Sequence, residues 1–284
     1  MKKFTTSIMI LLIAFGADTL FAQDNPLAPQ RKNDVIYFGP VLGYNRSMHS
    51  TDYTVEPAAN DGGAPCPSFT EGNENGFFFG MTGEYPLGDI KGSKSSIIAK
   101  VVYSTMPAYL EVGATEGELP SLVDDVLLKT DVTHAIDLTY NLIATEIIYK
   151  FNFAGAIGVT VGPTIDFALA VENKQVMQIT GPDKDRVRFL DYERYLDNPE
   201  LEEFAGVTFE EGGKVRTVDR NFDADVSNFR LGLKVGLQYT INLSQIIVVP
   251  HLTYNFGITN LSTKQDWRVS AIQAGFDVRW AFKY

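Results

Sequence analysis

Few residues in this sequence have the types and spacing that chemistry requires. The three histidines, His49, His134 and His251, are far apart, and no nucleophile elbow or zinc motif lies beside any of them. His49 and His134 are expected near the outer rim of the fold derived below, where a membrane-embedded hydrolase or acyltransferase could place its site. Scattered rim histidines are more often incidental, so the sequence predicts a protein without catalytic residues.

The cysteine and the carboxylate pairs also lack the neighbours of a reactive site. Cys66 lies between Pro65 and Pro67 and has no second cysteine for an internal disulfide. Three carboxylate pairs are adjacent in sequence: Asp124-Asp125, Glu202-Glu203 and Glu210-Glu211. Adjacent side chains of an extended chain point apart. We therefore expect no catalytic, cofactor-binding or metal-binding residues, and no cofactor.

The amino terminus has the order of a secretory signal peptide. Lys2 and Lys3 precede an apolar run at residues 8–15, and Ala22 offers a small residue for cleavage before Gln23. The run is too short to span a bilayer, which disfavours the alternative of an uncleaved anchor. Residues 1–22 are thus predicted to be a signal peptide, and residues 23–33 a short periplasmic leader.

Composition narrows the class of the exported chain. Its 284 residues suffice for one large all-β domain, and a mean hydropathy of −0.04 argues against a helical membrane protein. The formal charge of −11 gives no electrostatic footprint for nucleic acid.

The last fifteen residues, 270–284, indicate how the chain is built. Every second residue from Ile272 to Tyr284 is aromatic or aliphatic, and the residues between them are polar or small. A lipocalin-like or sandwich protein could also alternate in this way. Large rings along the apolar face, up to an aromatic last residue, are typical of the closing strand of an outer-membrane β-barrel, whose apolar side chains face lipid.

Seven further segments alternate in the same manner. The eight predicted strands are residues 34–47, 76–87, 96–112, 133–153, 156–171, 226–242, 246–259 and 270–284. The connections between them are alternately long and short, as in bacterial outer-membrane barrels with short periplasmic turns and longer extracellular loops. The sequence predicts an all-β fold: an eight-stranded antiparallel up-and-down transmembrane β-barrel over residues 34–284, in the outer membrane of a Gram-negative bacterium.

Several local irregularities are also expected. The third strand is interrupted near Met106-Pro107, where a bulge or an early exit is plausible. In the fourth strand the apolar set changes parity, which predicts a β-bulge near residues 142–144. The outward set before the change is Ile136, Leu138, Tyr140 and Leu142, and after it Ile147, Tyr149, Phe151 and Phe153. Short helical turns are expected within residues 119–128 and 189–204.

The inward faces carry charges of both signs. The predicted inward groups are Glu84, Asp137, Glu146, Asp166, Asp277, Lys100, Lys150, Arg230, Lys234, Arg279 and His251. Eight strands leave an interior that side chains can fill, and buried charges must pair. We expect a plugged polar lumen rather than a conduit, since a diffusion porin has roughly twice as many strands.

The connections concentrate negative charge. Residues 172–225 form the longest connection, and residues 48–75 and 113–132 are also acidic. One interpretation is a binding surface for a cationic partner or divalent ions, and the other is a solvated loop surface that is compatible with lipopolysaccharide. The expected partners are outer-membrane lipid, lipopolysaccharide and a protein bound at the acidic loops.

Five stretches resemble the PorT-type outer-membrane β-barrel domain family of Bacteroidota. They are residues 37–47 (YFGPVLGYNRS), 76–87 (GFFFGMTGEYPL), 144–153 (ATEIIYKFNF), 159–167 (VTVGPTIDF) and 252–261 (LTYNFGITNL). The resemblance implies a barrel over most of residues 37–284 and a part in protein secretion. It brings no catalytic residues, and fold alone does not fix function.

These features predict a non-enzymatic outer-membrane protein with a structural or surface-interaction role, as an accessory to protein secretion or envelope assembly. A small-solute channel is the alternative. A membrane-embedded enzyme with its site at the rim is a third hypothesis.

Overall fold

A computed structural model describes residues 35–54, 68–88, 94–122, 126–221, 227–243, 246–262 and 266–283. The predicted signal peptide, the leader at residues 23–33 and Cys66 lie outside these ranges. The strands are β1 (Val35–Thr54), β2 (Ser68–Leu87), β3 (Ser95–Thr105), β4 (Ala108–Pro120), β5 (Leu127–Ala154), β6 (Ile157–Ile179), β7 (Val207–Glu210), β8 (Val215–Asn221), β9 (Phe229–Tyr239), β10 (Ile241–Leu243), β11 (Ile246–Gly257) and β12 (Trp267–Lys283). The helical segments are α2 (Tyr192–Asp197) and the 3₁₀ turn η1 (Glu202–Phe204), and neither could cross a lipid bilayer.

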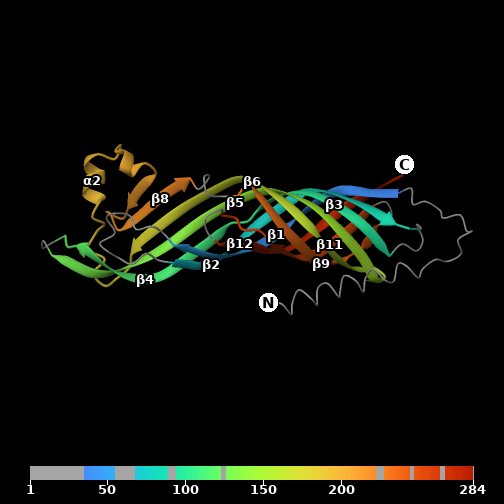
Figure 1. The fold of residues 1–284 in the computed structure, drawn as a ribbon, viewed down its shortest axis with the longest axis horizontal. Helices are drawn as coiled ribbons and strands as arrows, with labels where there is room; N and C mark the ends of the chain where they lie inside the picture. The colour runs from blue at the N-terminus through green and yellow to red at the C-terminus, as the bar shows by residue number, and fades with distance from the viewer. Residues whose placement is uncertain are drawn as a thin grey trace, which may run out of the picture.

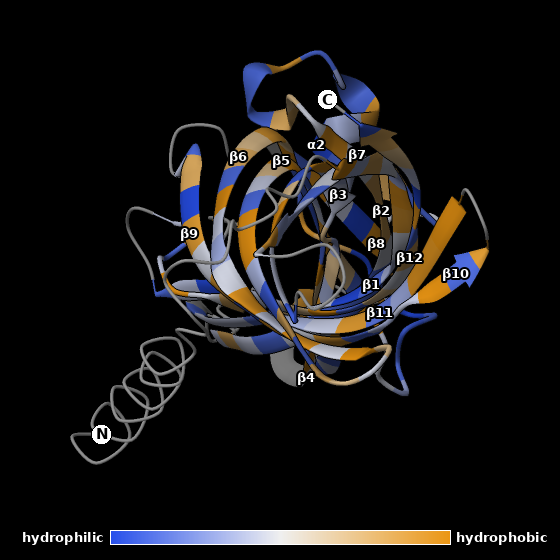
Figure 2. Cartoon of the chain, turned by 90° about the vertical axis from the view of Figure 1, so that its right-hand side faces the viewer, coloured by the Kyte–Doolittle hydropathy of each residue, from blue (hydrophilic) through white to orange (hydrophobic). Residues whose placement is uncertain are grey.

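Eight of the strands form a closed antiparallel ring. The order around the ring is β1, β2, β3, β5, β6, β9, β11 and β12, and β12 pairs with β1 along Val35↔Lys283 to Thr51↔Trp267. The view along the barrel shows this ring (Figure 2). The eight-stranded barrel predicted from the sequence is confirmed.

The strands continue well beyond the barrel at one end. There β4, β5, β6, β8 and β7 form a five-stranded antiparallel extension. This extension carries α2 and lies opposite the end where β12 finishes (Figure 1). With short turns such as Ala154–Ile157 at the β12 end, the extension is the extracellular end of the barrel.

Several predicted connections are therefore strand instead. Residues 48–75 were expected to lack periodicity, yet β1 runs to Thr54 and β2 begins at Ser68. The predicted acidic connection at residues 113–132 is largely the β4–β5 hairpin, and the helical turn expected within 119–128 is wrong because Leu119 pairs with Leu128 across the two strands. The predicted helix within residues 189–204 is confirmed by α2.

The break in the third strand lies where the prolyl residue predicted it. β3 ends at Thr105 and β4 begins at Ala108, on either side of Met106-Pro107. Beyond the break the chain keeps β5 as its neighbour in the same register, with Thr105 paired to Asn141 before it and Ala108 to Leu138 after it, and the register shifts only between Val112 and Thr115. Proline cannot donate a ladder hydrogen bond, which explains why the strand is interrupted there.

The direction of the β5 side chains corrects one prediction. Even-numbered β5 residues from Val132 to Lys150 are all buried, so the inward face never changes parity. Ile136, Leu138, Tyr140 and Leu142 face the interior and not lipid. Their apolar character reflects a dry core inside the extracellular end of the barrel, where the outer face meets water. Asp137 shares the opposite face and is exposed, so its predicted inward position is wrong.

The bulge is real, but the extra residue is in β6. Asn141 pairs with Ala170 and Leu142 with Ala168, which leaves Leu169 unmatched. Inward residues of β6 are even-numbered up to Asp166 and odd-numbered from Val171. The bulge thereby turns the upper half of β6 so that it can pair with β8.

Two apolar clusters fill the extracellular half. The first lies inside the ring and includes Met106, Leu138, Tyr140 and Trp267. The second lies under α2 and η1 against the extension, and includes Met177, Phe189, Phe204 and Val218. We call α2, η1, β7, β8 and the residues between them the extracellular module.

Candidate functional site

The outer surface of the barrel carries an apolar belt. Its members are large apolar side chains that are more than a third exposed: Phe38, Leu42, Tyr44, Phe77, Phe79, Met81, Val101, Ile147, Val161, Phe167, Leu231, Leu237, Leu252, Phe256, Ile272, Phe276, Trp280 and Phe282. Ten steps from Ile272 to Phe282 at roughly 3.3 Å per residue and a tilt of about 40° span about 25 Å. This is the height of the apolar band of an outer-membrane barrel. The hydropathy colouring shows hydrophobic and hydrophilic residues alternating along strands of the ring (Figure 2).

Inside the belt the lumen is filled by paired charges. Glu84 on β2 accepts hydrogen bonds from Ser96 on β3, from Lys150 on β5 at 2.7 Å and from Arg279 on β12. Because these groups come from four strands, the carboxylate ties together both sides of the β1–β12 closure. Charge-assisted hydrogen bonds of this kind are stronger than neutral ones.

Asp277 is the second centre of the network. It accepts from Lys100 Nζ at 3.1 Å and from Arg279, and His251 Nδ1 lies 3.6 Å from its carboxylate. Arg279 therefore bridges Asp277 and Glu84. The arrangement compensates two buried carboxylates with the cations that surround them.

Two further pairs complete the lumen. Lys234 contacts Glu146, and Arg230 donates from Nε to Asp166 at 2.8 Å and from Nη1 to the Val269 carbonyl at 2.6 Å. Arg230 is 1% exposed and Asp166 is fully buried. Of the predicted inward groups, only Asp137 is misplaced, because it belongs to the outer face of β5.

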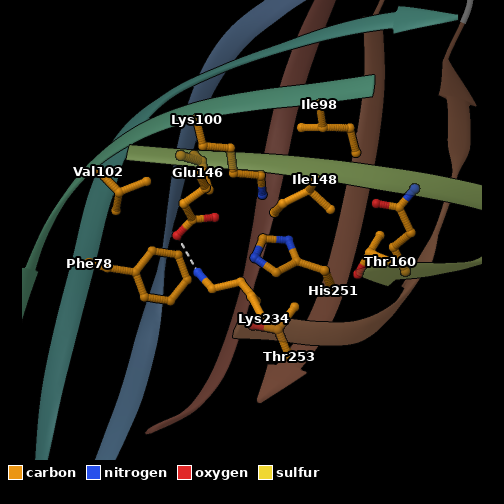
Figure 3. Close-up of a pocket in the computed structure, with 12 residues that line it drawn as sticks. Phe78, Ile98, Lys100, Val102, Glu146, Ile148, Thr160, Lys234, His251 and Thr253 are labelled. Carbon is orange, nitrogen blue, oxygen red and sulfur yellow. Dashed lines mark hydrogen bonds and ion pairs between the residues drawn. The ribbon is translucent and has the colours of Figure 1, made fainter. Parts of the chain in front are cut away.

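A small cavity interrupts this packing in the lumen. Figure 3 shows Lys100, Lys234, Glu146 and His251 around it, with Phe78 and Ile148 alongside. Its volume is about 20 Å³, which is the space of about one water molecule. The described lumen is thus largely filled by the paired side chains around this cavity.

The rim histidines are buried rather than open to a substrate. Trp267 Nε1 donates to His49 Nδ1 at 3.0 Å, so His49 Nε2 carries the proton and donates to the Met106 carbonyl at 3.2 Å. The pKa of His49 is lowered to about 3, mainly by burial. The hydrogen bond to the Met106 carbonyl opposes this change, and the charge of neighbouring Arg230 adds to it. Both nitrogens are occupied by structural contacts.

His134 faces the interior of the extension. It is 3% exposed, neither ring nitrogen contacts a polar group among the described residues, and burial lowers its pKa. Both histidines lie toward the extracellular end of the barrel, as the sequence predicted, but both are buried rather than open to a substrate. The described residues contain no cluster of His, Cys, Asp and Glu that is placed to hold a metal.

The extracellular module is well packed although the sequence showed little period there. Arg216 lies 3.1 Å from Asp191, both nearly buried, and the Tyr195 ring packs on Phe204 and Phe209 at 5.5 and 5.0 Å. This core was missed because its residues come from short, separate segments. The alternation of apolar Val207 and Phe209 with polar neighbours was the signal in the sequence that could have indicated the short strand β7.

One surface of this module is both acidic and apolar. Residues 190–203 contain six acidic residues and one basic residue. Leu190, Leu196 and Leu201 in the same segment are 42%, 55% and 38% exposed. We call this segment the leucine–acid segment. Its leucines lie beyond the membrane belt, so lipid does not account for them.

Comparison with known proteins gives a likeness of fold. No protein-family model matches the sequence, and no curated protein matches it. The structure resembles Ail, the attachment invasion locus protein of Yersinia pestis, with 11% identity and a TM-score of 0.33 over 86% of this chain and 98% of that one. Neisserial surface protein A gives 11% identity and a TM-score of 0.33 over 89% and 98%, and the Escherichia coli outer-membrane protease OmpT gives 8% and 0.30 over 91% and 99%. At this level the assignment as an outer-membrane-type β-barrel rests on the strand ring and the apolar belt.

Proposed function

We propose that this protein is a non-enzymatic β-barrel of a Gram-negative outer membrane that presents its extracellular module to a protein partner. The role is structural or interactive, as an accessory to protein secretion or envelope assembly. The belt contacts outer-membrane lipid, and the strands above it contact lipopolysaccharide. The single observation that carries the proposal is the leucine–acid segment on an ordered module that projects from a closed barrel.

The closed lumen supports this assignment over the channel hypothesis. Four carboxylates and five cationic side chains pair across the barrel, and the remaining cavity is about 20 Å³. A solute of any size would have to displace these pairs, and breaking buried ion pairs is strongly unfavourable. What the chain offers to other molecules is therefore its outside.

The leucine–acid segment suits a partner surface with basic residues around an apolar centre. Exposed apolar side chains beyond what solubility needs mark interaction sites. Acidic side chains around them favour a positively charged partner and exclude other acidic surfaces. Glu193 and Glu203 are held in ion pairs with Arg188 and Arg194, which orders the segment.

Site-specific photocrosslinking in intact cells tests the interaction. A photoreactive residue at Leu196 or Leu201 is expected to give discrete protein adducts, and the same residue at exposed Glu118 on β4 serves as the control. Adduct formation should fall when Glu200 and Glu202 are changed to Gln. Absence of protein adducts at both leucines would sink the proposal.

Planar-bilayer recordings on the pure protein test the alternative. We expect no conductance steps above the empty bilayer. Regular steps that disappear in an Arg279→Glu variant would identify a regulated conduit and replace the interaction role with a channel.

A further inference from the structure

The buried charges of the lumen do not balance. The carboxylates are Glu84, Glu146, Asp166 and Asp277, and the cations are Lys100, Lys150, Lys234, Arg230 and Arg279. All nine side chains are less than a tenth exposed, and the described lumen holds one more cation than carboxylate. An uncompensated charge in a low-dielectric interior is strongly unfavourable, so the excess is removed either by a bound negative charge or by a neutral lysine.

The cavity lies where such a charge would be bound. Lys100 of β3 and Lys234 of β9 both line it, together with His251 and Gln238 (Figure 3 labels the first three). Lys100 contacts Asp277 and Lys234 contacts Glu146. An ammonium group has three donors, so each lysine has donors beyond the one used in its ion pair.

Polar atoms without protein partners also line this cavity. The Gln238 amide nitrogen and the Thr160 hydroxyl are buried and contact no hydrogen-bonding group among the described residues. One carboxylate oxygen of Glu146 is in the same state, and Thr164, which pairs with Glu146 across the β5–β6 ladder, has a rotatable hydroxyl that can donate to it. The cavity thus offers an amide, a hydroxyl and two ammonium groups as hydrogen-bond donors. The Glu146 carboxylate oxygen is the group among them that disfavours an anion.

We propose that the cavity binds one small monovalent anion of halide size, held by Lys100, Lys234 and Gln238. The volume of about 20 Å³ is close to the space of one water molecule, which favours an occupant as small as a halide over phosphate or sulfate. A water molecule would satisfy the hydrogen bonds but would leave the excess charge. Chloride accepts hydrogen bonds from these donors and also supplies the negative charge, and it would lie between a lysine of β3 and a lysine of β9.

Binding is tested by the thermal stability of the full chain refolded in detergent micelles. A ligand that binds only the folded state raises the unfolding temperature with the logarithm of its concentration. We expect this rise in sodium chloride and in sodium bromide, but not in sodium gluconate at equal ionic strength, whose large anion cannot enter the cavity; sulfate is avoided because it stabilises folded proteins without binding a site. Equal unfolding temperatures in chloride and gluconate would overturn the proposal, since the excess charge would then be absent through a neutral lysine.

Two matched variants and a diffraction experiment locate the site. Lys100→Met balances the lumen charges and leaves Asp277 paired with Arg279, so it is expected to lose the chloride dependence. Lys174→Met removes an exposed lysine of β6 and should keep it. Crystals grown in bromide should show one anomalous peak between Lys100 and Lys234. A peak only at the surface, with water in the cavity, would refute the assignment.

Discussion

Arg230 provides the sharpest test of how the lumen is stabilised. It lies directly opposite Asp166 in the β6–β9 ladder and donates two hydrogen bonds to that carboxylate and one to the Val269 carbonyl. Arg230→Met keeps a flexible apolar stem but leaves Asp166 as a buried charge without its cation. The second oxygen of Asp166 has no hydrogen-bond partner among the described residues, so without Arg230 the carboxylate keeps no hydrogen bond from a side chain.

The magnitude follows from the burial of the pair. Removing one partner of a buried ion pair costs about 3–5 kcal/mol, whereas replacing both partners by apolar residues is often nearly neutral. We expect Arg230→Met to lose about 4 kcal/mol of unfolding free energy. The double variant Asp166→Leu/Arg230→Met should lie within about 2 kcal/mol of the original protein, which gives a coupling energy of several kcal/mol.

Urea unfolding in lipid vesicles measures these free energies, with tryptophan fluorescence and heat-modifiable gel mobility as probes. Arg186→Met is the control, because its ion pair with Asp183 at 3.4 Å is largely exposed and is worth about 0–1 kcal/mol. A loss below about 1 kcal/mol for Arg230→Met, or a double variant as unstable as the sum of the single variants, would refute the reasoning.

Three further predictions use other regions. Ile147→Arg in the belt should cost about 2–4 kcal/mol in vesicles, whereas Leu196→Arg, equally exposed but on the extracellular module, should change the unfolding free energy by less than about 0.5 kcal/mol. The pKa of His49 is about 3 in the folded state and about 6.5 in the unfolded state, so the unfolded state binds the proton first. Between these pH values His49 should contribute a fall in stability of about 1.4 kcal/mol per pH unit, and His49→Gln should reduce the slope of acid-unfolding titrations by this amount. Gly43→Ala should cost about 1–3 kcal/mol in urea titrations because a Cβ there would lie 2.4 Å from the Phe78 ring and from the Ala274 carbonyl oxygen, while Gly113→Ala, with open space around it, should be nearly neutral.

The barrel itself was predictable because lipid enforces a simple rule. In β12 the alternation of Ile272, Phe276 and Trp280 with Asp277 and Arg279 corresponds to the outer and inner faces of the structure. The same periodicity placed the charged side chains on the inner face, with Asp137 as the exception. Short turns and long connections gave the topology.

The extracellular extension was not predictable from the same rule because its environment is inverted. Above the belt the outer face meets water and the interior is apolar, so Leu138 faces in and Asp137 faces out. A period of two identifies two faces but does not say which one is buried. From the sequence alone, the exchange of the apolar face from the outside to the inside therefore resembles a bulge within β5, and the polar ends of the strands resemble loops.

The pairing in the lumen was only partly accessible from sequence. Periodicity placed Glu84 and Arg279 on inward faces, but their contact joins residues 195 positions apart. The choice of partner depends on the stagger of the strands, which alternation does not encode. The leucine–acid segment required the packing of α2 to show which leucines stay exposed.

The separation in sequence of the Glu84 partners has a consequence for biogenesis. Glu84 is made early, Lys150 midway and Arg279 almost last, and Lys100 meets Asp277 across 177 positions. A nascent sheet that still lacks β12 therefore exposes ionised groups whose counterions have not arrived, and it keeps its hydration shell on that side. Insertion of the final strand therefore completes the ion pairs of Glu84 and Asp277 and removes this water from the lumen.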